Sequence, residues 1–386
     1  MEEFAITSKK DQRALLTVQS FALLGQGLIG VFFPFFVQRS YGLNDWQLII
    51  WFACLQLAMA FIIFPLNYVG VKWFGIRRVV QLGIFFQALF YALLGLGITT
   101  LWSFILLNIS FLLFISLFWP GFNYLSSIAT TNGDRGNYFG SLQVVMVSVS
   151  LVAPVLTGFL LEWQQERWVL LLSIISFLIA LSLVRMIPKT GAEVSSLKLF
   201  KAQFFRIFFT KRNFPAFLAD SIITNTMWVL WPLYFKAVVG SFSVMGIITA
   251  ATALLEMFTA KFFGRLADKK SARWLLQSGA WARCIDLMLR AVYFKFNHLY
   301  VVLGIQSLGA VFGPWFNISA GTRIFEVGEE QSENMLDFLL GREVFLGFFR
   351  FIWFLPMGIL VYYTDVIYLA IAFVIAGLTA LAFRRL

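Results

Sequence analysis

The chain has 386 residues, of which 60% are hydrophobic and 13% are charged, and its mean hydropathy is +0.83. A typical soluble domain carries about 25% charged residues, and cores of this size could not hide so much apolar surface. The composition therefore excludes an ordinary water-soluble protein and indicates an integral membrane protein.

Near-continuous apolar runs recur along the chain, each close to the length of about 20 residues that a helix needs to cross a bilayer. They do not alternate, and they are longer than the roughly ten-residue strand of a membrane barrel, so helices are favoured over strands. The expected spans are 15–37, 46–68, 79–99, 101–125, 139–161, 168–187, 214–238, 243–263, 274–296, 299–320, 339–361 and 365–383. The first span follows a charged stretch without an A-x-A-like cleavage site, so we expect a retained helix.

A repeated motif divides these spans into two sets. One six-residue motif occurs twice, as Phe118-Trp119-Pro120-Gly121-Phe122-Asn123 and as Phe312-Gly313-Pro314-Trp315-Phe316-Asn317. Gly70 and Gly264 are separated by the same number of residues as the two copies. Such duplication is typical of membrane transporters that rock about their midplane. We therefore expect an all-α membrane protein with twelve transmembrane helices in two six-helix pseudo-repeats. The expected units are an N-terminal bundle (1–187), a cytoplasmic connecting loop (188–213) and a C-terminal bundle (214–386).

The net charge is +11, and the positions of the basic residues along the chain fit the predicted topology. With the N-terminus inside, most lysines and arginines fall in the even-numbered connections, the central connection and the chain ends. The outer connections keep only Arg39, Arg167, Lys236 and Lys295. This positive-inside pattern predicts cytoplasmic termini in a multi-pass protein, and we expect the plasma (inner) membrane. The basic excess is thus explained by topology, and nucleic acid is not an expected partner.

Motifs for bound cofactors or catalysis are missing from the sequence. No Walker-type phosphate loop or H-E-x-x-H motif occurs, Cys54 and Cys284 both fall in predicted helices, and His298 is the single histidine. We therefore do not expect the protein to be an enzyme, to hold a metal site or to bind a cofactor.

The connection after the eighth span carries the sharpest motif, Gly264-Arg265-Leu266-Ala267-Asp268-Lys269-Lys270. It resembles the G-x-L-A-D-[RK] signature of the major facilitator superfamily. A degenerate copy between spans two and three keeps Gly70 and the basic pair Arg77 and Arg78. The resemblance implies that this cytoplasmic motif (Gly264, Asp268, Lys269, Gly70, Arg77 and Arg78) latches helices, whereas the alternative is that its basic residues only enforce topology.

The fifth span resembles the antiporter signature of the same superfamily at Gly140 and Pro154, although other positions depart from it. Small residues and a proline also suit close helix packing without any function. The fourth span lacks the arginine of proton-linked members, so coupling stays open.

Placing a charged residue inside a membrane span costs free energy, so such a residue indicates either a function or a paired charge. Arg283, Asp286 and Arg290 are spaced as an ion triad on one helix face, and we interpret them as structural. The proton-coupling candidates are Asp220, Glu256 and Arg350. A fixed ion pair between Glu256 and Arg350 is the equally weighted alternative.

Polar and aromatic residues of spans one, four, seven and ten are the predicted substrate-cavity residues. They are Gln26, Asn108, Asn123, Asn225, Trp228, Gln306, Trp315 and Asn317. Pro34, Pro120, Pro232 and Pro314 lie in the same spans and permit bending.

These features favour a secondary transporter that moves a small organic solute by alternating access, with proton-coupled export as one form of it. The alternatives are an uncoupled facilitator or symporter, and a lipid-handling or sensor protein that keeps the fold. The expected partners are an organic solute, protons if transport is coupled, and membrane lipid, with the protein as a monomer.

Overall fold

The computed structural model describes residues 9–96, 100–129, 135–188, 190–269, 272–293 and 299–386, and these residues form helices without any strand. The first group of helices is α1 (Lys9–Ile29), α2 (Phe33–Tyr41), α3 (Asp45–Phe74), α4 (Ile76–Leu96), α5 (Leu101–Ile128), α6 (Arg135–Glu162) and α7 (Glu166–Leu183). After α8 (Leu197–Phe208), the second group is α9 (Asn213–Asn225), α10 (Trp231–Val239), α11 (Phe242–Lys269), α12 (Ala272–Ala291), α13 (Leu299–Gln331), α14 (Met335–Tyr363) and α15 (Ala370–Ala380).

Eleven helical stretches within the described residues are long and apolar enough to cross a membrane. They match the predicted spans except for 274–296, which corresponds to α12. Arg283, Asp286 and Arg290 make α12 less apolar than the others. Because α12 packs against α13 and α15, it belongs to the bundle, and its passage through the membrane stays a prediction.

The first helix of each group is interrupted just before a proline. A 3₁₀ turn, Gly30–Phe32, separates α1 from α2, and a π-helical segment, Thr226–Leu230, separates α9 from α10. Pro34 and Pro232 follow within the first turn of the next helix, where a missing N–H disturbs the helical hydrogen bonds. By contrast, α5 and α13 continue through Pro120 and Pro314.

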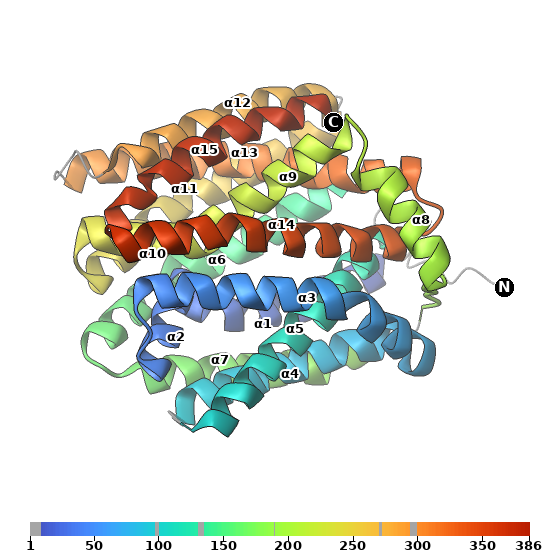
Figure 1. The fold of residues 1–386 in the computed structure, drawn as a ribbon, viewed down its shortest axis with the longest axis horizontal. Helices are drawn as coiled ribbons and strands as arrows, with labels where there is room; N and C mark the ends of the chain where they lie inside the picture. The colour runs from blue at the N-terminus through green and yellow to red at the C-terminus, as the bar shows by residue number, and fades with distance from the viewer. Residues whose placement is uncertain (1–8, 97–99, 130–134, 189, 270–271, 294–298) are drawn as a thin grey trace.

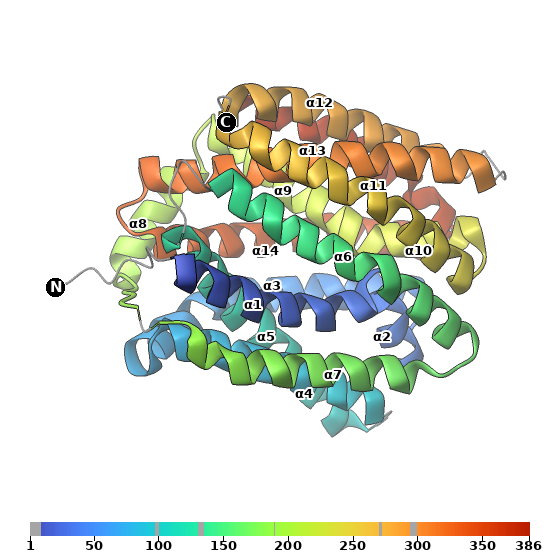
Figure 2. The same cartoon turned by 180° about the vertical axis from the view of Figure 1, so that it is seen from behind.

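The two helix groups meet along two seams. Figure 1 shows α14 beside α3, and Figure 2 shows α11 beside α6, and these pairs are in contact. The α6–α11 seam is close-packed because it has glycines on both sides: a Cβ added to Gly158 would lie 2.5 Å from the Phe242 carbonyl oxygen, and one on Gly246 would collide with the Pro154 carbonyl. Small residues let membrane helices approach in this way.

The start of α1, helix α8 and the end of the chain lie at the same end of the molecule (Figure 1). The connection before α8 contacts both groups there. The Tyr124 hydroxyl donates to the Gly191 carbonyl (3.1 Å), and the Ser195 backbone N–H donates to Asp337 (3.2 Å). This connection therefore ties α5 of the first group to α14 of the second.

The two motif copies are helix ends and not loops. Helix α3 continues past Gly70 to Phe74 and stops at Gly75, whose positive φ of 76° a glycine adopts easily. Arg77 donates to the Ile187 carbonyl (3.2 Å), whereas Arg78 is exposed. Helix α11 likewise continues past Gly264, and the side chains of Asp268 and Lys269 lie outside the described residues. A Cβ on Gly140 would lie 3.2 Å from the Gly264 Cα, so both glycines serve close packing of α6 on α11.

Candidate functional site

A cavity of about 620 Å³ lies between the two helix groups. This volume falls in the range of small-molecule binding sites. Its lining comes from α1, α2, α3, α4 and α5 on one side, and from α9, α10, α14 and the π-helical segment on the other. The lining residues used below are Gln26, Phe33, Gln56, Gln87, Phe90, Phe111, Trp119, Asn123, Thr224, Asn225, Trp228, Arg342, Glu343 and Arg350.

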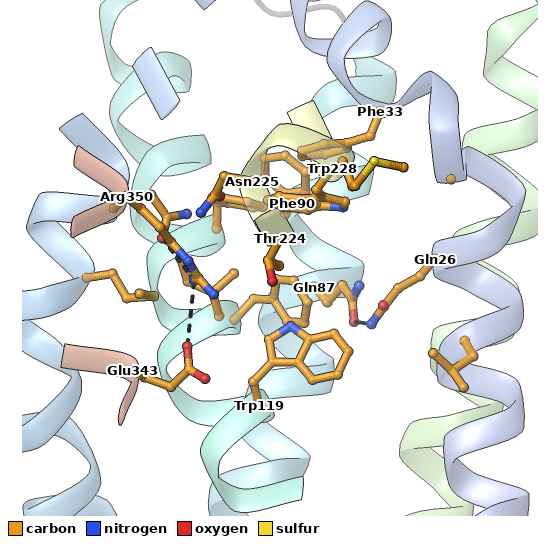
Figure 3. A pocket seen from close by; sticks show the side chains of 18 of the residues that line it. Gln26, Phe33, Gln87, Phe90, Trp119, Thr224, Asn225, Trp228, Glu343 and Arg350 are labelled. Carbon is orange, nitrogen blue, oxygen red and sulfur yellow. Dashed lines mark hydrogen bonds and ion pairs between the residues drawn. The ribbon is translucent and has the colours of Figure 1, made fainter. Parts of the chain in front are cut away.

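Aromatic rings from both helix groups meet at one end of the cavity (Figure 3). The Phe33 and Trp228 rings stack with centroids 5.5 Å apart at 17°, and Phe90 and Phe111 pack against Phe33. We call these four residues the aromatic roof. Phe33 follows the 3₁₀ turn and Trp228 lies in the π-helical segment, so the roof forms where both helices depart from regular geometry. Such π segments are frequent at functional sites.

Four charged side chains form a connected chain at the cavity, and we call Asp220, Arg342, Glu343 and Arg350 the cavity network. Arg342 donates to Asp220 (2.6 Å) and to Glu343 (3.3 Å). Arg350 lies 3.6 Å from Glu343 and donates to Gln56 of α3 (3.2 Å). Arg342, Glu343 and Arg350 line the cavity, whereas Asp220, which pairs with Arg342, is not part of the lining. The network therefore links α9 and α14 to α3 across a seam.

Two amide side chains lie on the opposite side of the cavity (Figure 3). Gln26 donates its amide N–H to the Gln87 side-chain oxygen (3.3 Å). Gln87 is buried, and its own Nε2 has no hydrogen-bond partner within the described part of the chain. This amide pair joins α1 to α4 beside the cavity.

The predicted cavity residues divide into two sets. Gln26, Asn123, Asn225 and Trp228 line the cavity, whereas Asn108, Gln306, Trp315 and Asn317 are outside its lining.

Each residue outside the lining has another setting. Asn108 accepts from the Trp51 indole (2.7 Å), and Trp315 donates to the Leu275 carbonyl (3.2 Å) between α12 and α13. Gln306 is buried on α13, and Asn317 is exposed.

The proton-coupling candidates are also separated in space. Arg350 lines the cavity and Asp220 pairs with Arg342, but Glu256 is on α11 and interacts electrostatically with Arg283. The carboxylate partner of Arg350 is Glu343, so the expected pair of Glu256 with Arg350 is replaced by a pair within α14.

Sequence analysis did not predict four of the lining residues described above: Gln56, Gln87, Arg342 and Glu343. Glu343 and Arg350 are separated by two helical turns and therefore share a face of α14. That periodicity could have been read from the sequence, but position 343 lies so close to the start of the predicted span that it is easily assigned to the membrane surface.

The predicted ion triad of α12 is confirmed as a set of contacts. Asp286 accepts from Arg283 (2.7 Å) and from Arg290 (2.8 Å), and all three residues are buried.

A family model matches most of this chain, and two solved structures share its fold. The family model described as Major Facilitator Superfamily matches residues 15–324. The human organic anion transporter MFSD10 (TETRAN) has a similar structure, with a TM-score of 0.69 and 11% sequence identity over 97% of this chain and 98% of that one. A bacterial homologue of the iron transporter ferroportin, in its outward-facing state, aligns with a TM-score of 0.68 and 16% identity over 97% of this chain and 98% of that one. No curated protein sequence matches this chain.

Proposed function

This chain belongs to the major facilitator superfamily, and we propose that it carries a small organic solute across the membrane through the cavity by alternating access. The observation that carries the proposal is the cavity of about 620 Å³ between the two helix groups, with an aromatic roof and a cavity network on its lining. A site between two groups of helices can open to either side as they rock against each other.

An organic solute fits this lining better than a metal ion. Metal-transporting sites need several carboxylate, imidazole or thiolate ligands. Among the described lining residues Glu343 is the single acidic one, and the described chain contains no group of three histidine, cysteine or acidic residues that could hold a metal. Aromatic rings and amides bind organic molecules by stacking and hydrogen bonding.

Contacts across the seams supply the parts that alternating access would break in turn. The Glu162 carboxylate, at the end of α6, accepts the backbone N–H groups of Phe242 (3.0 Å) and Ser243 (3.1 Å) at the start of α11. We call this contact the Glu162 clasp. The contact of Ser195 with Asp337 is at the end where α8 lies. In the proposal the two groups are the two six-helix units of a twelve-helix transporter, with both termini in the cytoplasm.

The cavity network makes proton coupling a part of the proposal that can be tested separately. It contains two carboxylates and two guanidinium groups: protonation of Glu343 would leave Arg350 without a carboxylate partner, and protonation of Asp220 would leave Arg342 with Glu343 alone. An uncoupled facilitator would keep the network fully ionised throughout.

Counterflow exchange of a panel of labelled organic solutes in proteoliposomes tests the proposed function. We expect exchange by the wild type and its loss in Asn123→Trp, because the larger side chain fills the cavity. Asn317→Trp is the matched control, since Asn317 holds the same place in the sequence repeat but is not part of the lining. Exchange that is equally fast in Asn123→Trp would contradict a route through this cavity. Proton uptake in the same vesicles, compared with Asp220→Asn and Glu343→Gln, would show whether exchange is coupled.

A further inference from the structure

We propose that the transported solute is an aromatic organic carboxylate, with its carboxylate bound by Arg350 and its ring against Trp228. The inference rests on the proposed function and adds the chemical class of the solute.

Arg350 has unused donors at the cavity. A guanidinium carries five N–H donors, and the contacts of Arg350 among the described residues use Nη1 alone, toward Gln56 and Glu343. Its Nη2 makes no hydrogen bond to the described residues and, unlike the enclosed Nε, is not a buried atom, so a molecule in the cavity can reach it. An acceptor placed there gains charge-assisted hydrogen bonds. The planar fork of arginine matches a carboxylate, which accepts two parallel hydrogen bonds.

Glu343 holds Arg350 weakly. The distance of 3.6 Å from Arg350 Nη1 to Glu343 exceeds a normal hydrogen bond, whereas Arg342 and Asp220 are 2.6 Å apart. A second carboxylate can therefore bind Arg350 while the strong Arg342–Asp220 pair stays intact. Glu343 keeps its contact with Arg342 (3.3 Å) in that case.

The charged groups of the lining favour an anion over a cation, although the cavity network as a whole is neutral. Arg342, Glu343 and Arg350 are the charged residues among the described lining. Arg342 is already held by Asp220 at 2.6 Å, so the open donors belong to Arg350. A cation would find Glu343 alone, already shared by two arginines. An anion instead meets a guanidinium with unused donors.

The aromatic roof indicates the other end of the solute. Trp228 is 41% exposed, although it is in the middle of a helix bundle, and it lines the cavity. Phe33 is buried and stacks on it, so the exposed part of the indole is turned to the cavity. Figure 3 shows Arg350 and Trp228 bordering the same space. Aromatic rings favour a planar apolar body that stacks on an open face.

Calorimetric titration of the full-length protein in lipid nanodiscs tests the inference with three probes of one shape: 1-naphthoate, 1-naphthamide and 1-naphthylmethylamine. We expect naphthoate to bind about tenfold or more tightly than the neutral amide and the cationic amine, as charge-assisted hydrogen bonds to arginine provide. Arg350→Gln should remove that preference and leave the affinity for naphthamide unchanged. Trp228→Leu should weaken both. Arg206→Gln, a change at an exposed arginine of α8, is the control and should bind like the wild type.

The inference is overturned if the wild type binds the amine or the amide as well as naphthoate, or if Arg350→Gln keeps the preference. Arg350→Lys retains the charge without the fork and should lose part of the preference, which guards against misfolding of Arg350→Gln. Counterflow separates the two proposals. If neutral or cationic solutes exchange and Asn123→Trp blocks them, the proposed function holds and the carboxylate inference fails. If no solute of any charge exchanges, the proposed function itself fails.

Discussion

The cavity network and the ion triad of α12 are both clusters of arginine and carboxylate within helices, and they differ in access. The cavity network spreads over α9 and α14, contacts α3 and borders a cavity. The triad of Arg283, Asp286 and Arg290 is confined to α12 and is away from the cavity lining. The two clusters therefore differ in whether a bound molecule can reach them, which matters because a charge within the membrane is costly unless it is paired or used.

The triad is covered on its neighbouring faces. Arg283, Asp286 and Arg290 are 5%, 0% and 4% exposed. The Arg290 guanidinium lies 4.3 Å from the centre of the Trp231 ring, and a Cβ on Gly309 of α13 would collide with it. Glycine at position 309 thus lets α13 pack directly on the ion pairs. We interpret the triad as a structural element that fixes α12 in the bundle.

The largest effect that separates the clusters is expected for Asp286→Asn. It removes the carboxylate that is hydrogen-bonded to both buried guanidinium groups, so we expect a loss of about 3–5 kcal/mol in the free energy of unfolding. Denaturation in detergent micelles, followed by circular dichroism, measures it. Asp220→Asn is the matched variant and should lose clearly less, because Arg342 keeps Glu343. Equal losses in the two variants would remove the distinction between the clusters.

The next effect concerns the packing of α13 on the triad. Gly309→Ala places a methyl group 2.8 Å from the Asp286 carboxylate and against Arg290, so the ion pairs must shift. Overpacking of this kind costs about 1–3 kcal/mol, measured in the same denaturation experiment. Gly304→Ala on the same helix is the control, since a Cβ there meets nothing within 4 Å. If Gly309→Ala is as stable as Gly304→Ala, the close contact is not important for stability.

The fold could be predicted from the sequence because its main signals are local. Apolar runs of sufficient length, the bends at Pro34 and Pro232, and the i, i+3 and i, i+4 spacing of the triad each depend on neighbouring residues. The kind of interruption was not predictable: similar sequences precede Pro34 and Pro232, yet a 3₁₀ turn lies before the first and a π segment before the second.

The site was predicted less well because it depends on the rotation of each helix about its axis. Asn123 lines the cavity, but its repeat partner Asn317 is not in the lining. On α13 the neighbouring Trp315 stacks on Phe263 of α11, with ring centroids 4.9 Å apart. This packing turns the Trp315 face of α13 toward α11 instead of toward the cavity. Helix rotation is set by such contacts between side chains, which a hydropathy pattern does not contain.

A smaller effect is expected within the cavity network, where Glu343 competes for Arg350. Glu343→Gln removes the competing charge, so we expect 1-naphthoate to bind about three- to tenfold more tightly, which corresponds to roughly 1 kcal/mol. Calorimetry in nanodiscs measures the change. Glu166→Gln, far along the chain and paired with Arg39, should leave the affinity unchanged. Weaker binding in Glu343→Gln would mean that Glu343 itself contacts the solute.

The smallest effect is expected for the Glu162 clasp. The Glu162 carboxylate belongs to neither cluster, is not part of the cavity lining, and binds the start of another helix. Its charge is at the start of α11, where the helix dipole favours an anion by about 0.3–1 kcal/mol. Glu162→Gln should therefore increase the fraction of molecules with this end of the α6–α11 seam open by about two- to fivefold. Distances between spin labels on exposed positions at the ends of α6 and α11 measure that fraction. Glu333→Gln serves as the control, because Glu333 is exposed and pairs with Arg206 of α8, away from this contact. An unchanged distance distribution in Glu162→Gln would show that packing at Gly158 and Gly246 alone closes the seam.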